Sequence, residues 1–434
     1  MSTTGGRASI YYDRTAGTPP RFPGLRGRIE LDTCVVGGGL AGLNVAQGLA
    51  ERGHADVGLL EARSLGFGAS GRNGGFVFSG FSLGEAALLR AVGPERARAL
   101  HRGTRDAVAL VRERSIRLGI DCDRVDSPVL WANWFDEPGI LRRRQALLAE
   151  QFGAQWEWID RSTLRGWLDT PRYTDALAEP GSFHFHPLKY LHGVARACER
   201  AGVALHEDTP ALSLEARPAG WRIRTPDGEV RARRVVLACG GYLAGLVPAV
   251  DRSILPIATY VMVTEPLGDR LTAVMRTVSA VYDTRFAFDY YRPLADGRLL
   301  WGGRISVRDR APAAVERLLR RDLARVFPSL AGVRIDHAWS GLMSYARHEM
   351  PQVGEVAPGL WVAQAFGGHG MAPTTFAGEL VASAIAEGDA RWRMLSDFGL
   401  VHGFKPVGLW AAQATYWWLQ GRDWLRGLRR RGVS

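Results

Sequence analysis

The sequence predicts an α/β protein with two domains, one built around a parallel sheet wound with helices and the other around a mostly antiparallel sheet. Residues 31–61 have the order strand, Gly-rich turn, helix and strand, which is that of a βαβ unit. Residues 255–307 are rich in strands, and residues 295–297 supply a tight turn between two of them. A chain of 434 residues is long enough for two or three domains.

The composition excludes several classes of protein. With 46% hydrophobic residues and 14 tryptophans, the chain is not disordered. Four cysteines are too few for a disulfide framework at this length, and no apolar run approaches the roughly 18 residues of a membrane span. The N-terminal residues lack the apolar stretch of a secretory signal, so we expect a cytoplasmic protein.

The positive charge is almost entirely arginine. The formal net charge is +11, and the only lysines are Lys189 and Lys405. The arginines are spread along the chain, apart from a cluster at the C-terminus, and no nucleic-acid-binding motif accompanies them. We therefore expect an anionic small-molecule substrate or a membrane surface as the partner, and no nucleic acid.

The elements follow from apolar periodicity and turn residues. Residues 1–28 are polar and contain three prolines, which predicts an extended arm. The first half then predicts a buried strand at 31–36, a helix at 40–52, a buried strand at 57–60, a Gly- and Ser-rich loop at 64–84, and mainly helical segments at 85–120 and 138–168.

The second half mixes strands and helices. It predicts a helix from 187 to about 201, strands at 203–207, 211–216, 221–225 and 230–238, a hairpin of 286–293 with 298–303, a helix at 312–326, a strand at 359–365 and a helix from Pro373 to about Glu387. Proline is tolerated at a helix start because its missing N–H would be unpaired there.

Residues 37–42 match the pattern G-x-G-x-x-G between the first strand and the first helix. Gly37 permits a tight turn, Gly39 lets the backbone approach a pyrophosphate at the helix N-terminus, and Gly42 lets the helix pack closely on the strand. Glu61 ends the next strand, 19 residues beyond Gly42, where its carboxylate can accept hydrogen bonds from a ribose. This unit predicts a dinucleotide site for either NAD or FAD.

Two later segments favour FAD. Residues 66–75 form a loop of small residues whose amides can lie against a long, flat cofactor, with Arg72 as a charged group. Residues 366–371 precede a helix whose N-terminus can stabilise negative charge near N1 and O2 of a reduced flavin. Each segment can instead be a structural turn.

With these motifs the chain resembles the FAD-dependent D-amino-acid oxidase superfamily, also called the glycine oxidase or sarcosine oxidase-like group, and within it the gamma-glutamylputrescine oxidoreductases. The similar pieces, which run from about residue 9 to 390, are Ser9-Ile10-Tyr11-Tyr12, residues 35–39, 68–75, Tyr290-Tyr291-Arg292, 297–303, Trp339-Ser340-Gly341 and 367–370.

The resemblance implies a Rossmann-type FAD-binding domain with a discontinuous, mostly antiparallel substrate domain and a C-terminal helix. The expected division assigns 1–85, 181–250 and 336–395 to the FAD-binding domain, 86–180 to a helical and substrate-domain part, 251–335 to the substrate sheet and 396–434 to an amphipathic helix.

The resemblance also implies oxidation of a C–N bond of an amine. A hydride passes from the carbon beside a neutral amine to flavin N5 of non-covalent FAD, water hydrolyses the imine to an aldehyde and an amine or ammonia, and O₂ or another acceptor takes the electrons. No metal is expected. The candidates for the catalytic pocket are His369, Tyr290, Tyr291 and Trp301, whose aromatic faces suit a cationic amine. Equally, the strand residues Tyr290, Tyr291 and Trp301 can belong to the hydrophobic core, and His369 can stabilise only the turn in which it lies.

The cofactor-binding residues that the resemblance implies are Gly37, Gly38, Gly39, Leu40, Ala41, Gly42, Glu61, Ala62, Ser70, Arg72, Asn73, Gly74, Gly75, Ala211, Gly240, Gly341, Gly367, Gly368, His369, Gly370 and Met371.

Three departures from the family concern cations. Met343 stands where D-amino-acid oxidases carry an arginine, Ala372 stands where sarcosine oxidase-like members carry a lysine, and residues 298–301 lack the family's oxygen-activating lysine. We therefore expect no bidentate carboxylate clamp and favour an amine whose reacting carbon bears no carboxylate, such as a γ-glutamylated amine. The candidates to bind a remote carboxylate of the substrate are Arg285, Arg292 and Arg304. These arginines can instead be strand residues exposed to solvent.

Other functions stay open at this point. One alternative is an N-methyl or D-amino-acid dehydrogenase that passes electrons to a quinone. Another is a non-catalytic, membrane-associated protein with a flavin fold, and a third is an NAD-binding dehydrogenase.

The C-terminal segment predicts an amphipathic helix. Trp410, Trp417 and Trp424 recur every seven residues, with Ala414, Gly421 and Leu428 near the same face. Arginines crowd its end, at Arg422, Arg426, Arg429, Arg430 and Arg431. The Trp face either packs on the protein's own core or a partner subunit, which is the commoner arrangement, or lies on an anionic membrane surface.

Overall fold

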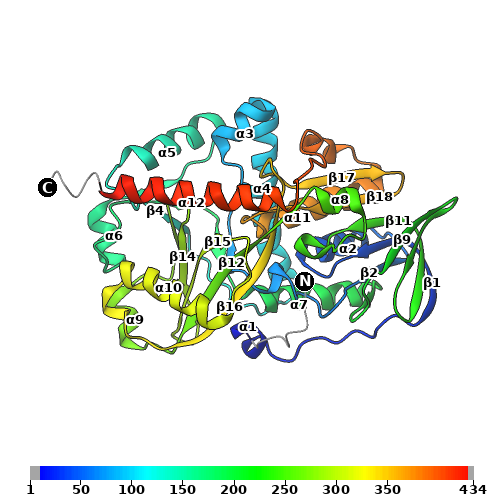
Figure 1. The fold of residues 1–434 in the computed structure, drawn as a ribbon, viewed down its shortest axis with the longest axis horizontal. Helices are drawn as coiled ribbons and strands as arrows, with labels where there is room; N and C mark the ends of the chain where they lie inside the picture. The colour runs from blue at the N-terminus through cyan, green and yellow to red at the C-terminus, as the bar shows by residue number, and fades with distance from the viewer. Residues whose placement is uncertain (1–9, 429–434) are drawn as a thin grey trace.

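The computed structural model describes residues 10–428, which form an α/β fold around two large sheets (Figure 1). The two expected sheets, one mainly parallel and one mainly antiparallel, are both present. Arg429, Arg430, Arg431 and Ser9, which carried predictions above, lie outside the described residues.

The first sheet holds the predicted βαβ unit. Its strand order is β17 (Gln352–Ala357), β18 (Leu360–Gln364), β11 (Gly228–Leu237), β1 (Gly27–Val36), β2 (Val57–Leu60) and β8 (Ala204–His206), and β10 (Gly220–Arg224) and β9 (Ser213–Arg217) extend it from β11. The strands from β18 to β8 are parallel, and β17 is antiparallel. The carboxyl ends of β1 and β2 therefore lie side by side, at the edge where α/β sheets bind ligands.

The second sheet is antiparallel except where β13 pairs with β4. Its strand order is β16 (Ile335–Tyr345), β12 (Leu255–Thr264), β15 (Leu299–Ser306), β14 (Asp289–Pro293), β13 (Val281–Asp283), β4 (Val129–Ala132), β6 (Ala176–Glu179) and β5 (Glu157–Ile159). A short ladder of β3 (Phe76–Val77) with β7 (Phe183–His184) lies apart from both sheets.

The helices cover these sheets. They are α1 (Tyr11–Thr15), α2 (Leu40–Glu51), α3 (Glu85–Val92), α4 (Pro94–Arg117), α5 (Gly139–Phe152), α6 (Arg161–Trp167), α7 (Pro187–Arg200), α8 (Pro248–Arg252), α9 (Asp269–Val274), α10 (Pro312–Val326), α11 (Met371–Glu387) and α12 (Val407–Leu428). Helices α2 and α11 pack against each other, and α10 packs on the second sheet.

Several predicted boundaries differ from the structure. The arm includes the short helix α1, and β1 begins at Gly27 because its polar first half pairs with β11. Strand β16 pairs with β12 of the second sheet, so the domain boundary expected at residue 336 is wrong. The short strand β5 interrupts the segment expected to be helical. Pro373 is the third residue of α11, where its missing N–H still costs no hydrogen bond.

A buried ion pair network fixes α2 against α4 and α11. The Arg114 side chain is completely buried, and its guanidinium donates to Glu51 at 2.6 Å and to Glu379 at 2.5 Å. A third bond, of 3.0 Å, goes to the side-chain oxygen of Asn44. Because α2 and α11 both begin at the candidate site described below, this network sets the position of two of its walls.

Arg114→Met should lower the free energy of unfolding by about 3 kcal/mol, because it leaves two partly buried carboxylates without their shared cation. Arg117→Met is the matched control. Arg117 also pairs with Glu51, but its side chain is 46% exposed, and its loss should cost less than about 1 kcal/mol. Urea denaturation of both variants measures the difference, and equal losses would contradict a structural role for the buried network.

Candidate active site

The Gly-rich turn between β1 and α2 leaves no room for side chains. A Cβ atom on Gly37, whose φ is +115°, would lie 2.5 Å from the carbonyl oxygen of Ala238. A Cβ atom on Gly42 would lie 2.0 Å from the carbonyl oxygen of Gly37. The N-cap residue Gly39 has no side chain to cap the helix. The Ser70 hydroxyl accepts from the first N–H of α2, that of Leu40, and the N–H groups that follow it are presented to a ligand.

Glu61 lies at the carboxyl end of β2, beside this turn. Its Oε2 accepts a hydrogen bond from Gly38 N–H at 2.7 Å, and its Oε1 accepts one from Arg63 N–H at 2.9 Å. Burial raises the pKa of Glu61 above its usual value. Thr209 N–H donates to the carbonyl of Glu61 at 2.8 Å, which brings the segment that contains Ala211 alongside.

Residues 72–75 form a loop in which four consecutive backbone carbonyls each accept a hydrogen bond from a different part of the chain. The donors, in order along the loop, are Trp339 Nε1–H at 2.9 Å, the Tyr12 hydroxyl at 2.8 Å, Arg292 Nε–H at 2.6 Å and Phe185 N–H at 2.9 Å. We call these four donors the carbonyl clamp. Three of them, Tyr12, Arg292 and Trp339, belong to motifs that carried the family resemblance.

The same loop is also docked on α2. Asn73 donates through Nδ2 to the carbonyls of Ala69 and Ser70, and its Oδ1 accepts from Gly75 N–H at 2.8 Å. The Ser70 hydroxyl oxygen accepts from Leu40 N–H at 2.9 Å. The loop therefore runs from the N-terminus of α2 to the second sheet.

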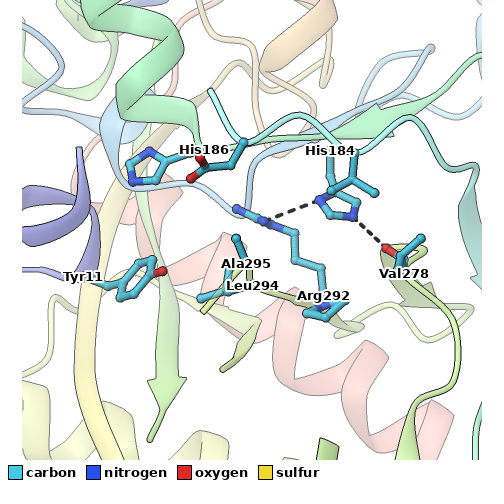
Figure 2. A pocket seen from close by; sticks show the side chains of 10 residues that line it. Tyr11, His184, His186, Val278, Arg292, Leu294 and Ala295 are labelled. Atoms are coloured by element: carbon cyan, nitrogen blue, oxygen red, sulfur yellow. Dashed lines mark hydrogen bonds between the residues drawn. The ribbon is translucent and has the colours of Figure 1, made fainter. Parts of the chain in front are cut away.

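Arg292 is a buried cation that carbonyl groups solvate. Its Nη2–H donates to the carbonyl of Phe185 at 2.8 Å, and its Nη1–H lies 3.4 Å from Nδ1 of His184. Burial and the Arg292 charge lower the pKa of His184 to about 3, so its imidazole is neutral. Figure 2 shows the guanidinium directed between His184 and His186, beside a cavity of about 150 Å³.

The turn at residues 367–370 forms the opposite wall. Gly367 has a φ of +61°, and a Cβ atom on it would lie 2.3 Å from the hydroxyl oxygen of Ser82. Helix α11 begins directly after Gly370, again without a side-chain cap. The His369 ring contacts Phe78 edge-on, with ring centres 4.9 Å apart, and burial lowers the pKa of His369 to about 4. His369 is therefore a neutral imidazole near pH 7.

Of the three strand aromatics proposed for the pocket, the structure brings only Tyr290 to the loop. Its ring lies against Gly302, where a Cβ atom would be 2.1 Å from Cζ, and against Gly74, where a Cβ atom would be 2.7 Å from Cε2. Tyr291 and Trp301 point to the other face of the sheet. They stack with ring centres 4.6 Å apart and are fully buried in the core beneath α10, so the structure does not bring them to the site.

The candidate arginines have other roles. Arg285 is paired with Asp283 and Asp289, and Arg304 is paired with Asp322. Arg292 belongs to the carbonyl clamp. The expectation that one of the three meets a remote substrate carboxylate is therefore not supported, because their guanidinium groups are already bound inside the protein.

A buried carboxylate and an aromatic wall were not anticipated. The Phe78 ring stacks on Tyr282 at 5.5 Å between ring centres, and Tyr282 stacks on Trp131 at 5.9 Å. Ser79, next to Phe78, donates from both its N–H and its hydroxyl to Oε1 of Glu179. The other oxygen, Oε2, is buried without a hydrogen bond within the described part of the chain. Burial raises the pKa of Glu179 to about 7.

Two of the family departures are visible at this site. Met343 lies at the 367–370 turn, since a Cβ atom on Gly368 would be 4.0 Å from its sulfur. Ala372 is completely buried in the first turn of α11. Neither position supplies a cation, as expected.

The donor set fits FAD. The N-terminus of α2 suits a pyrophosphate, and Glu61 suits a ribose. The loop at 72–75 suits a flat ring beside α11, whose N-cap residue Gly370 has no side chain. The remaining cofactor candidates lie next to these groups. Gly240 follows β11 behind the Gly37 turn, and a Cβ atom on Gly341 would lie 3.4 Å from that of Arg72.

Comparisons with known proteins agree with this geometry. Residues 32–384 match the family model described as "DAO: FAD dependent oxidoreductase". The chain is 35% identical to gamma-glutamylputrescine oxidoreductase of Escherichia coli over 385 residues, covering 88% of this chain and 89% of that one. It is 32% identical to a probable oxidoreductase of Haemophilus influenzae over 394 residues, again covering 88% and 89%. Glycine oxidase of Geobacillus kaustophilus has the same fold, with a TM-score of 0.70 at 22% identity, covering 86% of this chain and 98% of that one.

Tyr12→Phe should weaken FAD binding about fivefold, because the carbonyl of Asn73 loses a hydrogen bond worth about 1 kcal/mol and the loop loosens. Tyr11→Phe is the matched control, since the neighbouring hydroxyl faces Asp296 instead of the loop. Titration of apoprotein with FAD, followed by flavin fluorescence, measures both affinities. Equal affinities for the two variants would show that the clamp does not hold the cofactor loop.

Proposed function

The chain belongs to the DAO family of FAD-dependent oxidoreductases, and from this premise we propose that it oxidises a C–N bond of a substituted amine, such as a γ-glutamylated amine, to an imine. Water then converts the imine to an aldehyde and ammonia or a smaller amine. The 35% identity to the Escherichia coli enzyme supports this substrate class. So does the absence of a cationic side chain at Met343 and Ala372.

Bound FAD supplies the two-electron acceptor, which takes hydride from the carbon beside the nitrogen. The protein's part is to bind, orient and exclude water. Tyr290 and the neutral His369 give the site uncharged walls, and the carbonyl clamp fixes the loop between them. Such chemistry depends on positioning, so no acid–base pair has to act at the reacting carbon.

The observation that carries the proposal is the unpaired carboxylate oxygen of Glu179 behind the aromatic wall. The cation near Glu179 is Arg144, which is already paired with Glu85. An ammonium group at Oε2 would supply a cation for this buried carboxylate. Glu179 Oε2 therefore binds an ammonium group of an extended substrate whose reacting carbon lies nearer the cofactor loop.

The cofactor is held without a covalent bond, because the loop at 66–75 contains no histidine and no cysteine follows Cys239. The electron acceptor is O₂ or another oxidant. The absence of a lysine at 298–301 favours an acceptor other than O₂, which would make the protein a dehydrogenase.

An anaerobic absorbance spectrum tests the proposed function. The purified protein is mixed with γ-glutamylated diamines, free diamines, N-methyl amino acids and D-amino acids. Bleaching of the flavin band near roughly 450 nm by a γ-glutamylated amine is the expected result. Readmission of air then separates oxidase from dehydrogenase. Bleaching by D- or N-methyl amino acids alone would overturn the substrate class, and a yellow protein that no amine bleaches would overturn the activity.

Glu179→Gln should raise KM for the amine about tenfold and change kcat by less than about twofold, because a charge-assisted bond to the substrate is worth about 1.5 kcal/mol or more. Glu157→Gln is the matched control, an exposed carboxylate on the neighbouring strand. Steady-state kinetics measures both. A loss confined to kcat would place Glu179 outside substrate binding.

The same variant should change the pH dependence of stability. The raised pKa of Glu179 means that folding favours its protonated form, so the wild type loses stability as pH rises from about 4.5 to about 7. The glutamine does not titrate. The stability of Glu179→Gln relative to wild type should therefore increase over this range, by about 3 kcal/mol at most. Urea denaturation without substrate at pH 5 and pH 8 measures it, and a constant difference would contradict the raised pKa.

A further inference from the structure

Helix α12 turns its polar side toward the protein. Gln413 Oε1 accepts hydrogen bonds from the hydroxyl of Ser306 and from Val307 N–H, both at 3.1 Å. Asp423 Oδ2 accepts one from Phe286 N–H at 2.7 Å. Among residues 407–427 of the helix, the buried side chains are Tyr416, Gln413 and Asp423. Figure 1 shows α12, in red, lying lengthwise across the outside of the molecule.

The large apolar side chains of α12 are exposed, and two of them, Trp417 and Trp424, border a cavity that Asp322 and Arg325 of α10 also line. The exposed fractions are 53% for Trp410, 58% for Trp417, 65% for Trp418, 65% for Trp424 and 51% for Leu425. These residues recur at helical spacing and form one stripe, which Val407 and Phe404 continue at its start. The Trp face therefore does not pack on the protein's own core, the first of the arrangements considered for it. A contiguous apolar stripe on a surface marks an interaction site.

Three arginines lie over aromatic rings of this stripe. Arg308, Arg422 and Arg347 lie over the rings of Trp410, Trp418 and Phe404, at 5.7, 5.6 and 5.5 Å from the ring centres. The only acidic residue in 401–428 is Asp423, which points inward. Tryptophan at the level of the headgroups, with arginine beside it, is the composition of a helix that lies on an anionic membrane.

We propose that the outward face of α12 binds the surface of a bilayer that contains anionic lipids. Within residues 10–428 no helix is both long and apolar enough to span a bilayer, so the contact is with one leaflet.

A second copy of the chain fits this face less well than a bilayer does. A two-fold interface brings the same patch of both copies together, and this patch would set arginine against arginine with no outward acid on α12 to pair with it.

Vesicle co-sedimentation of the full-length holoenzyme tests the proposal. The vesicles contain phosphatidylcholine alone or with 30% phosphatidylglycerol, an ordinary anionic mixture of about one charged lipid in three. Binding is expected only to the anionic vesicles. The triple variant Trp417→Gln, Trp418→Gln and Trp424→Gln should reduce the bound fraction by about tenfold or more. Arg422→Glu should reduce it severalfold and make the remainder less sensitive to salt.

A matched control changes three exposed apolar side chains elsewhere on the surface, in Ile116→Gln, Leu212→Gln and Val278→Gln, which are 61%, 61% and 58% exposed. This control should bind vesicles like the wild type, and all variants should keep their bound FAD. Absence of binding to either vesicle would overturn the proposal. So would a wild-type dimer in sedimentation velocity that the Trp variant dissociates while vesicles stay unbound, because the occupant would then be a second copy.

Discussion

The four consecutive carbonyls at residues 72–75 need hydrogen-bond donors, and two of these donors, Arg292 and Trp339, come from the second sheet. The hydrogen bonds to this loop therefore constrain the position of the second sheet. A buried carbonyl without a donor costs about 1–3 kcal/mol. The donors come from α1, from the segment after β7, from β14 and from β16. The loop is therefore fixed by elements that are far apart in the sequence, and we propose that its other side binds the cofactor. A loop held in this way is organised before the cofactor arrives, which reduces the entropy lost on binding.

The charges around the site complement this arrangement. Arg292 is a buried cation held by carbonyls under the loop, and Glu179 is a buried acid with one oxygen unpaired behind the aromatic wall. The histidines at 184 and 369 are neutral, because burial lowers the pKa of both imidazoles. We propose that the cation of Arg292 beside the loop suits an acceptor that gains electrons, and that Glu179 suits a substrate that arrives as an ammonium ion.

Local patterns predicted the parts of the fold that local forces determine. The βαβ unit and its glycines were predictable because Gly37 and Gly42 meet backbone atoms at a close distance. The sequence did not predict which of the adjacent residues Tyr290 and Tyr291 faces the site. Successive side chains of a strand point to opposite faces of the sheet, and a shift of one residue in register exchanges the two faces. Glu179 was not predicted because β6 was not predicted and because its hydrogen-bond donor, Ser79, lies 100 residues away in the sequence. The motifs at Tyr12, Arg292 and Trp339 were recognised, but their common target was visible only in three dimensions.

Amide hydrogen exchange of the apoprotein, with and without added FAD, tests the account most directly. The account predicts slower exchange on FAD binding in three separate segments, at residues 37–42, 72–75 and 367–371, because the cofactor lies along all three. Protection confined to residues 37–42 would contradict it, since a dinucleotide would then occupy the βαβ turn without reaching the loop that the carbonyl clamp holds.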